Sequence, residues 1–293
     1  MMFRLDVPTA RGVVLNGVLF RAQKGKNTDT VMIAITGIHG NFYSNPFYYN
    51  IGDTLNAGRI DFIYTQTIDA FGRIETVNAN IRKKEIIGSW NERFSYTDEG
   101  IDAYLTFAKR EGYEHIILVG HSIGANKVIY YLSRHHDPRV KHFFLLSPAN
   151  LTYMMSEVTD REKQMIKEQI ESGDGDKMLP FPFMGWVECI ANTAYDWQFS
   201  GFLNNVHTAR NGDCSQAEKV THNSALLVGT YENFTDGDPS EYSGSLVKTT
   251  VWKTIVNQHF SRKHFLFSLR QGESWRGRWG SGGRGGGDFL LAL

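Results

Sequence analysis

The sequence has few cysteines, no excess of charge of either sign and no long apolar run. Only Cys189 and Cys214 occur in 293 residues, too few to hold a domain of this size together, which favours a reducing compartment. The 31 Lys and Arg residues balance the 31 Asp and Glu residues, so no global field favours nucleic acid or acidic lipid. No run of about 18 apolar residues occurs, and residues 1–8 carry Arg4 and Asp6 where a secretory signal would need a long apolar stretch. We therefore expect a cytoplasmic protein that binds no nucleic acid and is not stably inserted in a membrane.

Several motifs are also missing. No set of Cys and His residues has the spacing of a zinc site, no G-x-x-x-x-G-K-[ST] loop is present, and no internal repeat occurs at solenoid or propeller period. We therefore expect neither a metal nor a nucleotide cofactor. What the chain does have, 41% hydrophobic and 13% aromatic residues, is enough for one large domain with its own core.

Short apolar runs recur along the chain and are separated mostly by helical patterns. Apolar residues at helical spacing follow two of the runs, one set from Ile101 to Ala108 and one from Ala125 to Leu132. The alternation predicts an α/β fold with a mostly parallel central sheet and helices on both faces. The expected buried strands are residues 31–36, 60–64, 116–119, 140–146, 225–228 and 251–256.

Three further segments complete the expected organisation. Asn16-Gly17 lies between apolar triplets and predicts the turn of an antiparallel amino-terminal hairpin. Residues 151–222, with a charged helix from Glu157 to Glu171, form an expected inserted cap on a core made of residues 1–150 and 223–271. Eight of the sixteen residues from Gly272 to Gly287 are glycine, so residues 272–293 are expected to be a disordered tail.

The strongest chemical signal is Gly120-His121-Ser122-Ile123-Gly124, a G-x-S-x-G pentapeptide. A predicted strand leads into it and a predicted helix leads out, which is the context that exposes a nucleophilic serine above a sheet. The glycines allow strand and helix to approach closely around a strained residue. Ser122 is therefore the candidate nucleophile, and the backbone N–H of Ile123 is a candidate donor to the oxyanion.

The loop after residues 31–36 reads Thr36-Gly37-Ile38-His39-Gly40-Asn41-Phe42-Tyr43. Together with the pentapeptide it resembles the α/β-hydrolase superfamily, and in particular bacterial lysophospholipase-like or esterase-like serine hydrolases, over roughly residues 12–235. The resemblance implies an α/β-hydrolase fold and a second oxyanion donor in this loop. Thr36 stands where the family usually has His, Gly37 matches its Gly, and Ile38 matches the donor. In a competing register that starts at His39-Gly40, the donor is Asn41.

The family's order along the chain is serine, acid, histidine. Glu232 falls on the family's acid position after residues 225–228, with Asp236 and Asp238 as rivals. His259 follows the expected last strand and is the predicted base, with His264 as the second choice. The family continues from this histidine into a closing helix, whereas this chain continues into the glycine-rich segment.

The sequence thus predicts a serine hydrolase that cleaves a small-molecule carboxylic ester without a cofactor. Aromatic residues of the expected cap are candidates to line an apolar acyl pocket: Phe181, Phe183, Trp186, Tyr195, Trp197 and Phe199. The alternative is a noncatalytic binding protein of the same fold whose carboxyl-terminal end has changed. A third hypothesis, RNA binding through the arginines and glycines of the tail, has few arginines to support it. Composition and motifs predict no oligomeric state.

Overall fold

The computed structural model describes residues 1–22, 28–206, 213–229, 252–257, 267–270, 274–278 and 288–291. In chain order its elements are β1 (Met2–Pro8), β2 (Val14–Phe20), β3 (Thr30–Ile35), α1 (Phe47–Ala57), β4 (Asp61–Thr65), β5 (Ile74–Asn78), β6 (Lys83–Ile87), α2 (Thr97–Arg110), β7 (His115–His121), α3 (Ile123–His135), β8 (Val140–Leu146), α4 (Leu151–Ser156), α5 (Asp160–Glu171), α6 (Ala191–Phe199), α7 (Ser215–Glu218), β9 (Asn223–Gly229), β10 (Trp252–Asn257), β11 (Phe267–Arg270), β12 (Ser274–Arg278) and β13 (Asp288–Leu291). Short 3-10 helices cover Ile68–Ala70, Ser89–Asn91 and Phe94–Tyr96.

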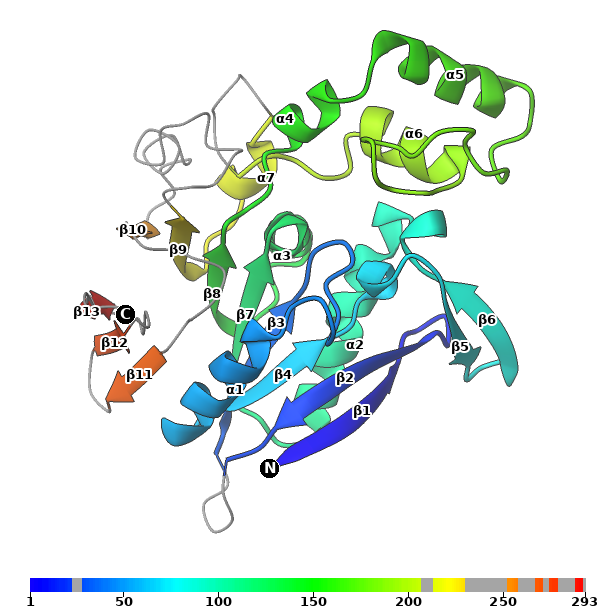
Figure 1. The fold of residues 1–293 in the computed structure, drawn as a ribbon. Coiled ribbons are helices and arrows are strands. Elements are labelled where there is room, and N and C mark those ends of the chain that lie inside the picture. Colours follow the sequence, from blue (N-terminus) through cyan, green and yellow to red (C-terminus); the bar gives the residue numbers. More distant parts are fainter. Residues whose placement is uncertain are drawn as a thin grey trace.

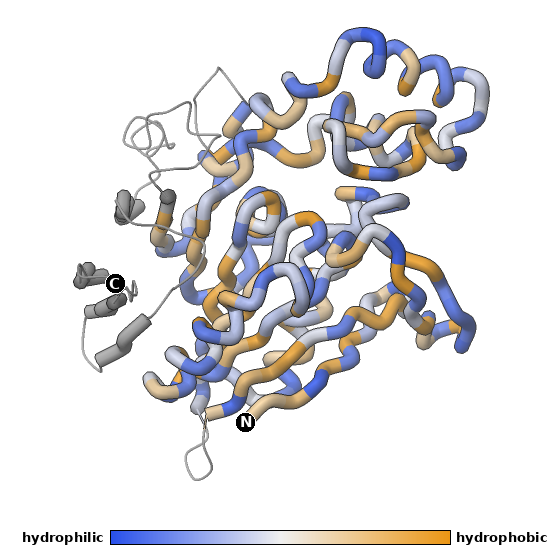
Figure 2. The backbone as a smooth tube through the Cα atoms, viewed as in Figure 1, coloured by the Kyte–Doolittle hydropathy of each residue, from blue (hydrophilic) through white to orange (hydrophobic). Residues whose placement is uncertain are grey.

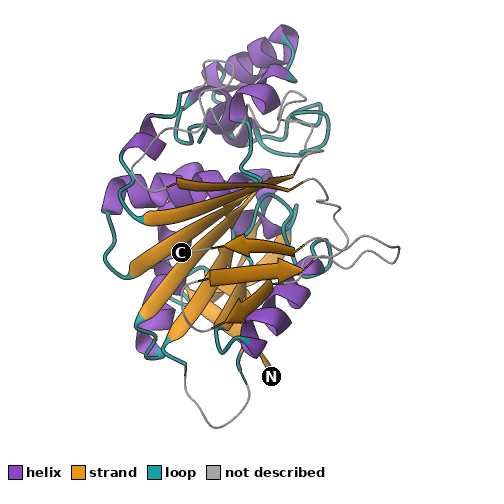
Figure 3. Cartoon of the chain, turned by 90° about the vertical axis from the view of Figure 1, so that its left-hand side faces the viewer, coloured by secondary structure: helices purple, strands orange, loops and turns teal. Residues whose placement is uncertain are grey.

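The central sheet has eight strands in the order β1-β2-β4-β3-β7-β8-β9-β10. Neighbouring strands from β4 to β10 pair in parallel, and β1 and β2 form an antiparallel edge. Helices cover both faces (Figures 1 and 3), which confirms the predicted α/β architecture and its strands. All the parallel strands therefore end at one edge, where ligand sites of such sheets form.

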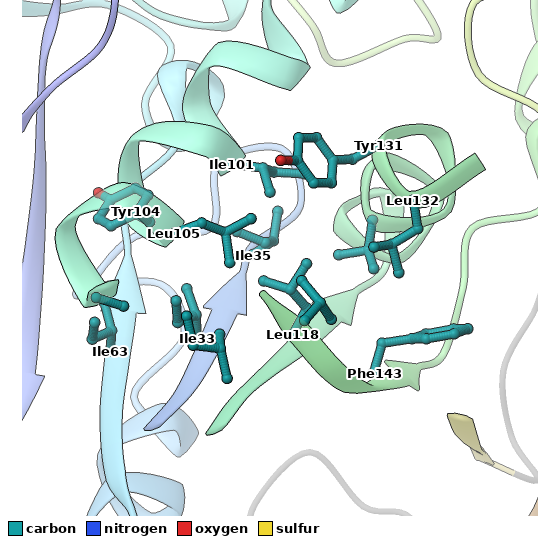
Figure 4. Close-up of a cluster of buried hydrophobic side chains, with 14 of the residues drawn as sticks. Ile33, Ile35, Ile63, Ile101, Tyr104, Leu105, Leu118, Tyr131, Leu132 and Phe143 are labelled. Atoms are coloured by element: carbon teal, nitrogen blue, oxygen red, sulfur yellow. The ribbon is translucent and has the colours of Figure 1, made fainter. Parts of the chain in front are cut away.

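The strands are apolar at nearly every position because both of their faces are buried. On β3, Ile33 and Ile35 face the cluster formed with α2 and α3, whereas Met32 and Ala34 face α1. Figure 4 shows side chains of the first cluster meeting between the strands and the two helices. This two-sided packing fixes the strand ends and thus the edge that carries the candidate site.

The amino-terminal hairpin is present, but its predicted turn at Asn16-Gly17 is wrong. Both residues lie inside β2, and the turn is formed by residues 9–12, where Gly12 has a φ of 90°. Gly17 serves a different purpose: a Cβ there would lie 3.2 Å from the Tyr64 carbonyl oxygen and 3.4 Å from the Tyr104 ring. The glycine marks a close approach between strands and α2 rather than a turn.

Residues 151–206 lie above the edge at which the parallel strands end, where Figures 1 and 2 show α4, α5 and α6 together. This part of the predicted cap has an apolar core of its own, in which Ile166 of α5 and Ala194 of α6 pack with Phe183. The charged helix begins at Asp160 rather than at Glu157, because Thr159 and Glu162 form a capping box there. The short helix α4 precedes it.

Two regions differ from the expectation. The antiparallel pair β5–β6 was not predicted, and it projects from the body beyond β2 (Figure 1). Within residues 272–293, where disorder was expected, β12 and β13 form a three-stranded sheet with β11.

Within the described ranges, no helix is both long and apolar enough to cross a lipid bilayer.

We expect Leu118→Ala to lower the free energy of unfolding by about 2–5 kcal/mol, because Leu118 lies between the sheet and α3 with 0% exposure. Urea unfolding followed by circular dichroism measures the change. Met2→Ala is the control, since Met2 is 58% exposed and its loss should change the value by less than about 0.5 kcal/mol. Equal effects of the two variants would contradict the described core.

Candidate active site

Ser122 lies between β7 and α3 in a backbone conformation that a residue with a side chain rarely adopts. Its φ is 55° and its ψ is −130°, and the residue is only partly buried. A Cβ on Gly120 would collide with the backbone of Ala125, and one on Gly124 would collide with the Ile35 carbonyl oxygen. The two glycines of the pentapeptide thus permit the sharp strand-to-helix turn, as predicted, and such strain is typical of functional positions.

Backbone hydrogen bonds hold this turn in place. The Ser122 N–H donates to the Leu146 carbonyl at 3.0 Å, and the Ser122 carbonyl accepts from the N–H of Ala125 at 2.9 Å and of Ala149 at 3.3 Å. Ile123 is the first residue of α3, with Ser122 at the N-cap. Its backbone therefore lies at the positive end of the helix dipole, where negative charge is stabilised.

The loop after β3 lies directly beside the serine. A Cβ on Gly37 would lie 3.1 Å from Ser122 Cβ and 3.4 Å from its Oγ, so the glycine allows this contact. The next residue, Ile38, is half-buried and packs in one apolar cluster with Ile123. The structure therefore brings together three of the five predicted site residues: Ser122, Ile38 and Ile123.

The competing donor, Asn41, is engaged elsewhere. Its N–H donates to Ser44 Oγ at 3.2 Å, and its side-chain oxygen accepts from the N–H of Tyr43 at 2.9 Å and of Ser44 at 3.1 Å. Asn41 thus shapes the loop, and its N–H is already used inside it.

The side chain of His39 in the same loop is fixed by contacts outside the loop. Its φ is 55°, its Nε2 lies 2.8 Å from Ser89 Oγ, and its ring meets the edge of Trp186 with centroids 5.5 Å apart. The imidazole is therefore held by Ser89 and by a cap side chain.

The predicted acids Glu232, Asp236 and Asp238 and the predicted bases His259 and His264 lie outside the described residues. The strands before them are described. Because β9 and β10 run parallel to β7 and β8, the chain leaves both strands at the edge where Ser122 lies. The connections that follow β9 and β10 thus start at the end of the sheet where Ser122 lies.

An apolar cluster fills the space between Ser122's neighbours and the cap. Ile38 and Ile123 meet Leu151 and Met154 of α4 there, together with Trp197 and Phe202. The aromatic residues predicted to line an acyl pocket behave differently: Phe181, Phe183 and Phe199 pack in the cap's own core, and of that set only Trp197 also reaches this cluster. Leu151 and Met154 of α4, which the sequence did not single out, take part in this cluster instead.

Buried Asn126 links α3 to Ala149, just before the predicted cap, and to Asn204 within it. Its Nδ2 donates to the carbonyls of Ala149, at 3.2 Å, and Asn204, at 2.8 Å, and its Oδ1 accepts from the Ala149 N–H at 3.1 Å. Asn205 Oδ1 in turn accepts from the Leu151 N–H at 2.6 Å. Asn126 therefore joins α3, the helix that follows Ser122, to the chain just before the predicted cap and to a point inside it.

A buried ionic cluster lies beside the same helix. Lys127 Nζ lies 2.8 Å from Asp69 Oδ2 and also pairs with Glu92 Oε1. Burial and the nearby Asp69 carboxylate raise the pKa of Glu92 to about 8, although Lys127 opposes the shift. Burial disfavours the charged Lys127, but the two acids raise its pKa above the ordinary value. From Ile123 to Ser133 every residue of α3 is buried in the structure, so a lysine in this stretch requires charged partners.

Asp29, Glu114 and His115 are the described residues whose ligand atoms could together hold a metal ion, lying within 4.8 Å of one another. All three are exposed. They lie at the start of β3 and β7, the opposite end of the sheet from Ser122. They cannot contribute to chemistry at the serine.

We expect Gly124→Ala to disrupt the turn at Ser122, because the added Cβ meets the Ile35 carbonyl oxygen and carbonyl atoms of Thr36. The free energy of unfolding should fall by at least about 2 kcal/mol. Gly100→Ala is the matched helical control, since its Cβ would lie 3.7 Å from the nearest atom, Leu15 Cδ1, and should stabilise α2 by about 0.5–1 kcal/mol. Thermal unfolding compares the two, and equal tolerance would contradict the close approach of α3 to β3.

The fold is shared with solved hydrolases at low sequence identity. Est1E from Butyrivibrio proteoclasticus has a TM-score of 0.57 and 15% identity, covering 87% of this chain and 88% of that chain. The α/β-hydrolase GrgF from Penicillium sp. sh18 has a TM-score of 0.59 and 11% identity over 88% and 90% of the two chains. The Pyrococcus furiosus esterase PF2001 has a TM-score of 0.55 and 12% identity over 88% and 82%. These likenesses confirm the α/β-hydrolase fold.

Sequence comparison gives a more direct assignment. No curated protein sequence matches this chain. The model of the family described as "Protein of unknown function (DUF1749)" matches residues 16–200, a segment that runs from β2 through the turn at Ser122 to the end of α6. This protein is therefore a member of the DUF1749 family, with the fold of the α/β-hydrolases.

Proposed function

We propose that this protein is a serine hydrolase that cleaves carboxylic esters through an acyl-enzyme on Ser122. The observation that carries the proposal is the strained conformation of Ser122, with φ 55° and ψ −130°, at the edge where the parallel strands end. Strain of about 1–3 kcal/mol persists where function requires it. The Gly37 loop beside the serine adds the place where an oxyanion would be bound.

In the proposed reaction Ser122 Oγ attacks the ester carbonyl carbon while His259 accepts the hydroxyl proton. The backbone N–H groups of Ile38 and Ile123 stabilise the negative charge that develops on the carbonyl oxygen. His259 returns the proton to the leaving alcohol, and water then hydrolyses the acyl-enzyme by the same steps. Glu232 orients the imidazole; Asp236 and Asp238 are the other candidate acids.

Two observations support this assignment of roles. The Asn41 N–H is engaged by Ser44 Oγ, which favours Ile38 as the second oxyanion donor. The parallel course of β9 and β10 delivers the segments after both strands to the edge that carries Ser122, as the order serine, acid, histidine requires.

We further propose that the acyl group is apolar. Half-buried Leu151 and Met154 of α4 and Ile38 of the loop form an apolar surface next to Ile123, the residue after the nucleophile. The neighbour Est1E has been solved with ferulic acid bound, so that fold can hold a carboxylic acid with an aromatic group. Contacts of this kind discriminate acyl groups by size.

We expect a fluorophosphonate probe to label Ser122, and Ser122→Ala to abolish both labelling and hydrolysis of p-nitrophenyl butyrate without loss of the fold. The probe reacts with an activated serine whatever the natural substrate is. Ser156→Ala is the control, because Ser156 is an exposed hydroxyl in the cap, and this variant should label normally. Mass spectrometry locates the label, and circular dichroism checks the fold.

The same assay tests the base. We expect His259→Ala to abolish labelling, since Ser122 would lose its proton acceptor, whereas loss on His264→Ala alone would assign that role to His264. A folded wild-type protein that never labels would refute the hydrolase proposal and favour the noncatalytic binding protein.

We expect Met154→Ala to reduce kcat/KM for a long-chain ester such as p-nitrophenyl octanoate about 10-fold more than for the acetate, because an apolar contact with the acyl chain is lost. Met155→Ala is the matched control, since this neighbouring side chain packs in the cap's own core. This variant should change kcat/KM for the two esters by the same factor. A parallel loss for both esters in Met154→Ala would contradict the proposed acyl surface.

A further inference from the structure

The loop Gly37–Asn41 is held in place by the segments that follow β4 and β6 and by Tyr64 of β4, whose hydroxyl donates to the Asn41 carbonyl at 2.6 Å. The His39 N–H donates to the Asp69 carbonyl at 2.8 Å, and Asn41 Nδ2 donates to the Ala70 carbonyl at 2.8 Å. His39 Nε2 contacts Ser89 Oγ at 2.8 Å. The loop beside Ser122 therefore depends on the 3-10 helices Ile68–Ala70 and Ser89–Asn91 for its position.

One side chain fastens both 3-10 segments to α3. Lys127 Nζ lies 2.8 Å from Asp69 Oδ2, within the first segment, and it also binds Oε1 of Glu92, which directly follows the second. Thr67 Oγ1 adds a hydrogen bond to Asp69 Oδ1 at 2.6 Å. Since α3 begins directly after Ser122, the cluster connects the loop to the helix that carries the nucleophile.

The cluster is too deeply buried to touch a substrate. Lys127, Asp69 and Glu92 are 3%, 0% and 4% exposed, and the cavity beside Glu92 and Lys127 measures about 20 Å³, room for about one water molecule. Burying three ionisable groups is costly, and apolar residues can often replace such a cluster without loss of stability. Its presence therefore calls for a role other than stability.

We propose that the Lys127–Asp69–Glu92 cluster positions the loop Gly37–Asn41 against Ser122 and thereby sets the rate of the chemical step. This role rests on the proposed serine hydrolase function. A shift of about 1 Å in an oxyanion donor can cost about 100-fold in rate. Leu151 and Met154 of α4 supply most of the proposed acyl surface, and the loop adds Ile38 to it, so we expect the cluster to act on kcat far more than on KM.

The charge of the cluster gives the positioning a pH dependence. Two carboxyl groups share one ammonium group, so the cluster is neutral only while one acid keeps its proton. Glu92 faces Lys127 of α3 and Asp69, and Arg93 and Tyr96 line the same cavity. The pKa of Glu92 is raised to about 8, so alkaline pH removes its proton and adds a buried negative charge to the cluster. Because the folded state holds this proton more tightly, stability falls as pH rises from the ordinary carboxyl pKa to about 8 and is constant above it.

The main test compares two variants by steady-state hydrolysis of p-nitrophenyl butyrate. Lys127→Met, combined with Asp69→Asn and Glu92→Gln so that no unpaired charge stays buried, should lower kcat about 10–100-fold while KM changes less than about 3-fold. Arg139→Met is the matched control. Arg139 pairs with Asp137 and Asp102 at 2.6 and 2.5 Å beyond the far end of α3, so kcat should stay at the wild-type value.

A pH profile supplies a second test that needs only one isosteric change. Wild-type kcat should fall several-fold as pH rises through about 8, because Glu92 ionises, and Glu92→Gln should have a level profile over the same range. A wild-type kcat that stays level, or a fall that survives in Glu92→Gln, would overturn the proposal. So would an unchanged kcat in the folded triple variant.

Hydrogen exchange separates failure of this proposal from failure of the hydrolase proposal. The triple variant should speed amide exchange in the peptide containing residues 37–41 at least about 10-fold relative to wild type and Arg139→Met, because the main-chain carbonyl of residue 69, which accepts from the His39 N–H, is no longer held in place through Lys127. This readout needs no catalysis. If Ser122 is inert but exchange accelerates, the hydrolase function alone is refuted; unchanged exchange refutes the positioning role.

Discussion

The close approach of α3 to β3 is the constraint on which the rest of the site depends. Gly124 lies so near the Ile35 carbonyl oxygen that any Cβ would collide with it, and Gly120 is equally tight against Ala125. Ser122, in the tight turn between β7 and α3, has the strained conformation with φ 55° and ψ −130°. The same contact keeps α3 against the sheet, so the helix buries residues around its whole circumference rather than along one stripe.

A helix buried all round must satisfy every polar side chain it carries. Asn126 and Lys127 are neighbours in α3, and both are almost fully buried. Asn126 uses its amide to bind Ala149, just before the cap, and Asn204 within it, and Lys127 uses its ammonium to bind the acids near the loop after β3. If either side chain lacked hydrogen-bond partners, its burial would lower the free energy of unfolding by several kcal/mol. Because each has partners, it links α3 to a segment distant in the sequence.

The sequence was sufficient for the parts of the fold in which local pattern and environment agree. The strands buried on both faces were predicted because each is a short apolar run, and the turn at Ser122 because strand, glycines and helix occur in order. The turn predicted at Asn16-Gly17 was wrong because a sequence does not distinguish a glycine required for close contact with Tyr104 from a glycine required for a turn. Asp69 and Glu92 gave no local signal, since their partner lies far along the chain.

These two links make α3 the element that holds both the loop and the cap near Ser122. Through Lys127 it holds the segment that fixes the Gly37 loop, and through Asn126 it holds the cap whose Met154 packs near Ile123. A displacement of the helix would therefore move Ser122, the loop and the cap together and preserve their relative geometry. A change in either link would move one of them alone, which is the more damaging event for the proposed reaction, because that reaction requires all three within a fraction of an ångström.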